Sequence, residues 1–429
     1  MSAAEVPPPA APVVDLAAVR TDEQRRRQVS DLHAMLTRND KGAAHGTVSN
    51  IILVLSLDPA LRGLVGFNEF TSAPFVRRSP PAAVEGMAEM PGPYPRPWGR
   101  ADVSLIQSYI QRVWTHQAGR EDTESAMLTV ASANRCHPPR DWLNGLAWDG
   151  RARLDLWLAH CFGADDTPFC RAAAAKILIA AARRVRQPGC KFDHMLILEG
   201  DQDLGKSTCL RRLAGDDWFT DSLPASIESK DMAIALQGIW IAEFAEIEQV
   251  IRTEVEVIKA FLTKPSDRFR PPYGKSDLTF PRQCVFFGTT NSTDYLRDSS
   301  GNRRFWPIRC SRADVAWIIA AREQLWAEAA ARETAGEAHW IDTESVRTEA
   351  TAAQAERLDA DVWTDRIREY LGITRTTTVG SVLNDALFVP VERQGKREQM
   401  RVASILRQEG WTRVVSWKDG KTDRSWERP

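Results

Sequence analysis

The stretch Gly200-Asp201-Gln202-Asp203-Leu204-Gly205-Lys206-Ser207 decides the fold that we expect for this sequence. It has the spacing G-x-x-x-x-G-K-[ST] of a phosphate-binding loop. The apolar run at residues 194–199 predicts a buried strand before the loop, and residues 208–213 have helical spacing after it. Strand, glycine loop and helix follow in the order that this motif requires, because loop N–H groups and the helix N-terminus must face one phosphate together.

The loop predicts a site for a nucleoside triphosphate and magnesium, and the flanking strand and helix argue against a chance match. The Lys206 side chain would reach the β- and γ-phosphates, and the Ser207 hydroxyl would ligate Mg²⁺. The remaining contacts would come from the loop as a whole. The expected nucleotide-binding residues are Gly200, Asp201, Gln202, Asp203, Leu204, Gly205, Lys206, Ser207 and Thr208.

Hydrolysis also requires a carboxylate beside the loop, to hold the metal or to activate water. Glu243 follows the apolar residues 239–242, which predict a buried strand. Glu243 would therefore stand at the carboxyl edge of the sheet, where open α/β sheets bind their ligands. We expect it to hold Mg²⁺ together with Ser207. Glu246 is a second candidate acid, although a solvated helix face explains it equally well.

Two further polar features complete the expected catalytic set. Asn291 ends the apolar run 284–290 and could orient the attacking water, but an asparagine at a strand end is commonly a turn residue. Arg303 and Arg304 could stabilise charge on the γ-phosphate, and an adjacent subunit can supply such an arginine. A surface pair with ordinary salt bridges is the alternative for these arginines.

A basic segment lies between the two later strands. Residues 262–284 hold five basic and two acidic side chains, and aromatic residues interleave with the basic ones. This pattern suits a loop that follows a nucleic-acid backbone and stacks on bases. An ordinary basic hairpin is the alternative. The expected DNA-binding residues are Lys264, Arg268, Arg270, Tyr273 and Lys275.

Composition is that of an ordinary globular protein, with 43% hydrophobic and 26% charged residues and a formal net charge of -1. Any DNA binding must therefore come from local patches. No apolar run is long enough to span a bilayer, so we expect no membrane partner. Seven scattered cysteines without a CxxC pair indicate reduced thiols and a cytoplasmic protein.

The sequence predicts five parts. Residues 1–28 predict a disordered tail, 29–150 a mostly helical N-terminal domain, and 151–312 an α/β core around the loop. Residues 313–360 predict a helical connector. Residues 361–429 have the order helix, helix, helix, hairpin of a winged helix, and thirteen basic against ten acidic residues give them a net charge of +3. DNA contact and protein docking explain this last domain equally well.

An ordered series of short motifs resembles the virulence-associated protein E (VapE-like) family of phage, prophage and satellite replication proteins. The ATPase region of that family is similar to the superfamily 3 helicases. The resemblance runs over about residues 142–309, and no single motif carries it. The motifs are 146–150 (LAWDG), 188–191 (PGCK), the glycine loop, 216–219 (DDWF), 229–231 (SKD), 243–246 (EFAE), 269–274 (FRPPYG), 288–291 (GTTN) and 301–307 (GNRRFWP).

The resemblance implies an AAA+-like P-loop NTPase core that forms a homo-oligomeric ring, commonly a hexamer. With ATP and Mg²⁺ as cofactors, such a ring moves along single-stranded or forked DNA. A primase or other replication proteins are further expected partners. The segment 264–275 would correspond to the channel hairpin that grips DNA. By the same resemblance, Lys206 and Ser207 would form the Walker A site, and Glu243 would be the Walker B acid. Asn291 would be the sensor, and Arg303 or Arg304 would be the arginine finger.

One position departs from the family pattern. Asp203 stands where the family loop often carries a second glycine, and its charge near the phosphates would lower nucleotide affinity. Some relatives also carry a primase domain. Residues 29–135 show no paired-aspartate strand and no zinc-ligand set, so we expect no priming activity.

The function expected from the sequence is that of an ATP-dependent DNA helicase or translocase. It would belong to a phage, prophage or satellite replication system and act in the bacterial cytosol as a ring that hydrolyses ATP between its subunits. Two alternatives remain. One is an ATP-switched DNA-binding or origin-loading protein without unwinding activity, and the other is a defence or signalling NTPase scaffold.

Overall fold

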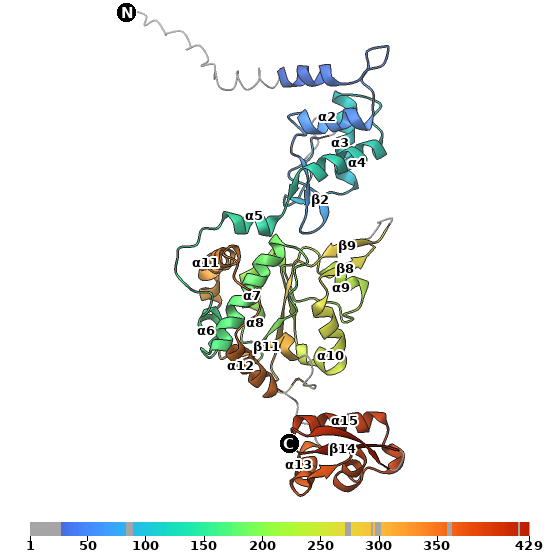
Figure 1. The fold of residues 1–429 in the computed structure, drawn as a ribbon. Coiled ribbons are helices and arrows are strands. Elements are labelled where there is room, and N and C mark those ends of the chain that lie inside the picture. Colours follow the sequence, from blue (N-terminus) through green and yellow to red (C-terminus); the bar gives the residue numbers. More distant parts are fainter. Residues whose placement is uncertain are drawn as a thin grey trace, which may run out of the picture. The chain divides into compact units, whose positions relative to one another are not determined.

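In the computed structural model, most of the chain forms two compact units (Figure 1). The units divide between Asp141 and Trp142, a few residues before the limit predicted at 150. Of the predicted disordered tail, residues 27 and 28 are described, and they already belong to a helix over 27–35. The described residues are 27–82, 89–270, 276–292, 295–296, 302–357, 363–418 and 421–428.

The first unit packs three longer helices against a small sheet that the sequence did not predict. The helices are α2 Val48–Leu57, α3 Arg100–Val113 and α4 Arg120–Ala133. The sheet has the order β3-β2-β1-β4, with β1 Val65–Asn68, β2 Ala73–Val76, β3 Arg96–Pro97 and β4 Arg135–Cys136. Strands this short leave too little alternation of apolar and polar residues to be recognised, and β4 pairs with β1 from far along the chain.

Within the described residues, the second unit is built on a five-stranded parallel sheet with the order β11-β5-β10-β7-β6. The strands are β5 Met195–Glu199, β6 Phe219–Thr220, β7 Ile241–Phe244, β10 Val285–Thr290 and β11 Phe305–Arg309. Every residue of β5, β7 and β10 is buried, as expected where helices cover both faces of a parallel sheet. The unit is therefore mixed α/β, as predicted, and β10 lies between β5 and β7.

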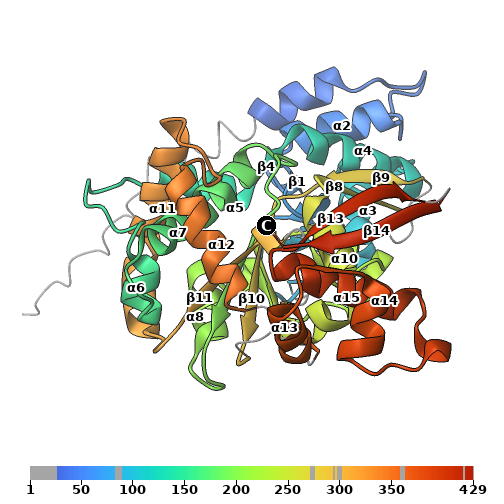
Figure 2. The ribbon, with the colours of Figure 1, turned by 60° about the horizontal axis from the view of Figure 1, so that its bottom comes forward.

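Helices lie on both faces of this sheet (Figures 1 and 2). On one face, Ile251 and Ile258 of α10 join Phe286 of β10 in an apolar core. On the other face, Trp326 of α11 stacks on Trp240 with ring centroids 3.9 Å apart. The helices of this part of the unit are α6 Trp157–Phe162, α7 Pro168–Arg186, α8 Lys206–Ala214, α9 Lys230–Ala235, α10 Ile247–Thr263, α11 Val315–Thr334 and α12 Glu344–Ala355. Helix α5 Pro138–Gly145 runs across the division between the two units.

The C-terminal part, residues 363–428, has an apolar core of its own that includes Ile367, Leu406 and Trp426. Its helices and hairpin follow the predicted order, and the short β12 adds a strand, so that the sheet order is β12-β14-β13. The turn predicted at 419–420 lies outside the described residues. The elements are α13 Thr364–Gly372, β12 Thr376–Thr377, α14 Val379–Ser381, a π-helical turn Val382–Ala386, α15 Lys396–Gln408, β13 Thr412–Lys418 and β14 Lys421–Glu427.

A buried ion pair holds the end of β5, immediately before the glycine loop. Glu199 accepts two hydrogen bonds of 2.9 Å from the Arg357 guanidinium and one of 2.8 Å from the Tyr295 hydroxyl. All three residues are buried. Because burial removes the hydration of both charges, each charge depends on its partner. The network joins three segments that are distant in sequence at the point where the loop begins.

Removing one partner of this pair should therefore destabilise the fold strongly. We expect Arg357→Ala to lower the free energy of unfolding by about 3–5 kcal/mol, because it leaves the Glu199 carboxylate buried and uncompensated. The control is Arg171→Ala, which breaks the more exposed pair with Asp166 and should cost about 1 kcal/mol or less. Urea unfolding of the two variants gives the comparison. If the two variants lose equal free energy of unfolding, the buried pair contributes no more to stability than the exposed pair does.

Candidate functional site

The glycine loop between β5 and α8 makes a tight turn that depends on unusual backbone angles. Gly205 has φ 95° and Asp203 has φ 60°, both in the left-handed region. A Cβ atom on Gly200 would lie 2.7 Å from the Cys310 carbonyl oxygen. The Gly200 N–H donates to the Thr290 carbonyl oxygen at 3.1 Å, which fastens the loop to the end of β10. Asp203 thus adopts a conformation in which glycine is unstrained and aspartate is tolerated.

The Lys206 ammonium lies inside this loop. Its Nζ atom donates hydrogen bonds of 2.7 Å to the carbonyl oxygens of Gly200 and Asp201. Lys206 is buried, and burial lowers the pKa of its side chain. Helix α8 begins at the same residue, so the positive end of the helix dipole and the cation face the same space. Together they would attract a polyanion.

Glu243 connects the loop to its neighbouring strands. Its Oε1 atom accepts a 2.6 Å hydrogen bond from the Ser207 hydroxyl and another of 2.6 Å from the Thr289 hydroxyl. Glu243 is fully buried, and burial raises the pKa of its carboxyl group. Sequence reasoning missed Thr289. The signal was the pair of threonines that ends the apolar run of β10, and it became meaningful only once β10 was known to lie beside β7.

The atoms around Glu243 fit a magnesium site. Glu243 Oε2 is buried and has no hydrogen-bond partner among the residues that the structure describes, which is costly unless a ligand satisfies it. Mg²⁺ prefers oxygen ligands and is usually held by one or two carboxylates together with substrate phosphates. The described residues contain no group of three or more His, Cys, Asp or Glu side chains that could hold a metal ion. Bound phosphates would therefore have to complete the coordination.

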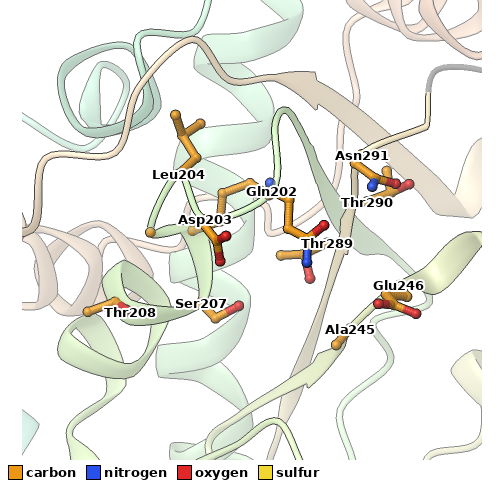
Figure 3. A pocket seen from close by; sticks show the side chains of 12 residues that line it. Gln202, Asp203, Leu204, Ser207, Thr208, Ala245, Glu246, Thr289, Thr290 and Asn291 are labelled. Atoms are coloured by element: carbon orange, nitrogen blue, oxygen red, sulfur yellow. The ribbon is translucent and has the colours of Figure 1, made fainter.

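A cavity of about 350 Å³ opens beside the loop (Figure 3). Asn291 and Glu246 face it from the side opposite the loop. Glu246 precedes α10 with φ 49° and accepts a hydrogen bond from the Gln249 side chain. The structure thus brings both candidates to the same cavity as the loop. The lining residues are Gln202, Asp203, Leu204, Gly205, Lys206, Ser207, Thr208, Ala245, Glu246, Thr289, Thr290 and Asn291.

Arg303 and Arg304 are not brought to this cavity. They precede β11, which runs parallel to β5, whereas the loop follows β5. The pair therefore lies at the amino edge of the sheet, roughly one strand length of about 16 Å from the loop. The Arg303 carbonyl oxygen accepts a 3.1 Å hydrogen bond from His194 Nδ1, just before β5 begins. Neither arginine can act on phosphates bound by its own chain.

Two strands of the basic segment pair as a β-hairpin, β8 Ser266–Phe269 with β9 Leu278–Pro281, which is the form that the family resemblance implies and that we also gave as the alternative to a loop. Arg282 anchors it, because its buried guanidinium makes two hydrogen bonds to Asp267, of 2.7 and 2.8 Å. Of the five predicted DNA-binding residues, three are exposed and two lie outside the described residues. The exposed ones are Lys264, Arg268 and Arg270, and the others are Tyr273 and Lys275.

Residues 143–359 match the virulence-associated protein E-like (VapE-like) domain. The chain belongs to this family. Among solved structures it is similar to the apo structure of the NrS-1 C terminal region, with 12% identity, a TM-score of 0.43 and coverage of 85% of this chain and 96% of that chain. For a second apo form of that region, the identity is 14%, the TM-score 0.37, and the coverage 67% and 78%. No curated protein matches this chain.

The part of this VapE-like protein that the structure describes holds no helix with both the length and the apolar character needed to cross a bilayer.

Replacing Glu243 should change how stability depends on pH. Burial raises its folded-state pKa above the ordinary 4.5, so its contribution to stability is full below 4.5 and falls as pH rises through the raised pKa. Glutamine does not ionise. From pH 5 to pH 8, the melting temperature of Glu243→Gln should therefore rise relative to the wild type. Thermal unfolding followed by circular dichroism tests this, with the exposed Glu246→Gln as control. A difference that stays constant with pH would contradict it.

Proposed function

We propose that this chain is an ATP hydrolase that unwinds DNA during replication of a phage, prophage or satellite. The observation that carries the proposal is the pair of hydrogen bonds from Ser207 and Thr289 to Glu243. These bonds bring a loop suited to a triphosphate next to an acid suited to its metal. Membership of the VapE-like family supports the role in replication.

Each side chain at the cavity has a part in the proposed chemistry. Lys206 would pair with the β- and γ-phosphates, and Ser207 and Glu243 would hold Mg²⁺. When bound, Mg²⁺ would neutralise charge on the transferred phosphoryl group. Asn291 and Glu246 lie across the cavity from the loop, where they would orient the attacking water. We accordingly assign the core to the AAA+-like P-loop NTPases.

The position of the arginine pair supports an assembly of several subunits. Arg303 and Arg304 lie at the sheet edge opposite the loop, so they could serve only a cavity of another chain. An arginine supplied in this way stabilises the charge of phosphoryl transfer. We therefore propose a homo-oligomeric ring with ATP held between subunits, and a hexamer is the size that the family resemblance suggests.

Two parts of the chain would contact DNA. The β8–β9 hairpin exposes Arg268 and Arg270, which suit the phosphate backbone of a single or forked strand. Arg268 lies 4.0 Å from Asp277, an exposed pair that a phosphate could replace. Residues 363–428 have the order of helices and strands of a winged helix, and we propose that they act as a docking or DNA-binding module.

Strand displacement with a forked DNA substrate tests the proposed function. The wild type should hydrolyse ATP faster with DNA present and should separate the strands. Lys206→Ala should lose about 100-fold or more in hydrolysis and should lose unwinding, because the phosphates lose their cation. Arg212→Ala is the control on the same helix, since Arg212 forms an exposed pair with Asp216.

The same assay separates the alternatives. DNA binding that needs ATP but is never followed by strand separation would favour an origin-loading protein. Hydrolysis that DNA does not stimulate would favour a defence or signalling NTPase. Hydrolysis that survives in Lys206→Ala would contradict the assigned nucleotide site.

Substituting Asp203 tests whether its charge or its backbone angle limits nucleotide binding. Asp203 is exposed, lines the cavity and has φ 60°, so its carboxylate lies near the place proposed for the phosphates. Asp203→Asn keeps tolerance for this φ and removes the charge, and it should tighten binding of a fluorescent ATP analogue by about three- to tenfold. Asp203→Gly should gain at least as much. Asp216→Asn, at the far end of α8, should change nothing. If neither Asp203 variant binds the ATP analogue more tightly than the wild type, then neither the charge nor the backbone angle of Asp203 limits nucleotide binding.

A further inference from the structure

A second cavity, of about 380 Å³, lies at the amino end of β5, the end opposite the glycine loop. Its walls come from the end of α7, the segment between α7 and β5, and the segment between α11 and α12. Arg183, Lys191 and Phe192 are among its lining residues, and so are His194, His339 and Trp340. None of these residues has a part in the proposed ATP chemistry.

We propose that this cavity binds one unpaired base of single-stranded DNA. The inference rests on the proposed function, because it assigns a second DNA contact to the same motor. It goes further by naming the residues that would recognise an unpaired base, as distinct from the sugar-phosphate backbone alone.

The walls of the cavity are suited to stacking. Trp340 is 49% exposed, although tryptophan is usually well buried, and it meets His339 edge to face with ring centroids 4.9 Å apart. Phe192 is buried beneath the cavity, and His194 stacks on Trp306 with ring centroids 4.4 Å apart. An aromatic side chain that is half exposed over an aromatic floor can stack on any base.

Two residues that line this cavity each carry a buried acceptor atom with no partner among the described residues. His339 is 5% exposed, and its Nε2–H donates to the Lys191 carbonyl oxygen at 2.9 Å, so Nδ1 carries a lone pair. That Nδ1 atom is buried without a hydrogen-bond partner, and so is Oδ1 of Asp193. Burial lowers the pKa of His339 and keeps its ring neutral. A ligand that satisfies these atoms must offer N–H donors, such as the exocyclic amino groups of cytosine, adenine and guanine.

The charge at the cavity favours a nucleotide over a protein side chain. Lys191 is exposed and Arg183 is partly exposed, and both line the cavity. Lys191 Nζ lies 3.3 Å from Oδ2 of Asp193, so one carboxylate stands beside the two cations. An arginine or lysine from a second protein would offer N–H donors but would add a third cation to this group and no anion. A nucleotide offers an amino group for the acceptors, a ring for Trp340 and a phosphate for the cations.

The cavity is also joined to the proposed DNA hairpin. The Gly189 N–H donates to the Arg282 carbonyl oxygen at 2.9 Å, and the Arg282 N–H donates to the Pro265 carbonyl oxygen at 2.9 Å. The turn that leads into the cavity is thus bonded to the residue that follows β9, and that residue is bonded in turn to the one that precedes β8. Because these bonds fasten the base of the hairpin to the turn beside the cavity, we expect a DNA strand that lies on the hairpin to continue to the cavity.

Binding of three oligonucleotides of equal length and charge tests the proposal. Fluorescence anisotropy would compare oligodeoxycytidine, oligodeoxyuridine and an abasic strand. The full-length wild type should bind them in that order of decreasing affinity. Trp340→Ala should weaken binding of the cytidine strand by about tenfold, as expected for one stacked base, and leave the abasic strand unchanged. His339→Phe should remove the preference for cytidine over uridine, because these bases differ in the donor that faces the acceptors.

The control is Trp148→Ala, which removes another partly exposed tryptophan of the same unit, 39% exposed, and should behave as the wild type. Equal affinities of Trp340→Ala and Trp148→Ala for all strands would overturn the base site and leave the DNA motor standing. A wild type that binds no oligonucleotide would instead contradict the proposed function. A loss of oligomer mass in Trp340→Ala without DNA would also overturn the proposal, since a protein partner would then fill the cavity.

Discussion

The hydrogen bonds that converge on Glu243 are the contact on which the site depends. One carboxylate oxygen accepts hydrogen bonds from the hydroxyl groups of Ser207 and Thr289. Ser207 lies in the helix that follows β5, and Thr289 lies in β10. The contact is possible only because β10 lies between β5 and β7, so that the carboxyl ends of three parallel strands meet. Within the described part of the chain, the second oxygen of Glu243 is buried and has no hydrogen-bond partner. The fold therefore holds an unsatisfied acid beside the loop, which is suited to a metal ion.

The parallel sheet also divides the proposed functions between its two edges. The glycine loop, Glu243 and Asn291 stand at or near the carboxyl edge, where the nucleotide would bind. Arg303 and the aromatic cavity around Trp340 stand at the amino edge. Since a strand of five residues is too long for a side chain to span, the arginines of one chain do not reach the loop of the same chain. Separation within one chain is thus the physical reason to expect cooperation between chains.

Two of the four described non-glycine residues with positive φ line the cavity beside the loop. Asp203 and Glu246 both have positive φ, although neither is glycine, and both line that cavity. Such angles cost about 1–3 kcal/mol each and persist only where the surrounding structure imposes them. At Asp203 the tight turn between β5 and α8 imposes the positive φ. The buried Glu199–Arg357 pair, one residue before the loop, helps to hold that turn in place.

The sequence by itself determined the strand, loop and helix around Lys206, the α/β class and the acid at Glu243, because local periodicity and motif spacing encode them. It could not determine the strand order, because pairing between β5, β10 and β7 joins residues far apart in the chain. For the same reason it missed Thr289, the sheet of the first unit and the buried partner of Glu199. It gave Arg303 and Arg304 as arginines that an adjacent subunit can supply, but it could not show at which end of the sheet they lie. Only tertiary packing decides which strand ends meet, and so which side chains share a site.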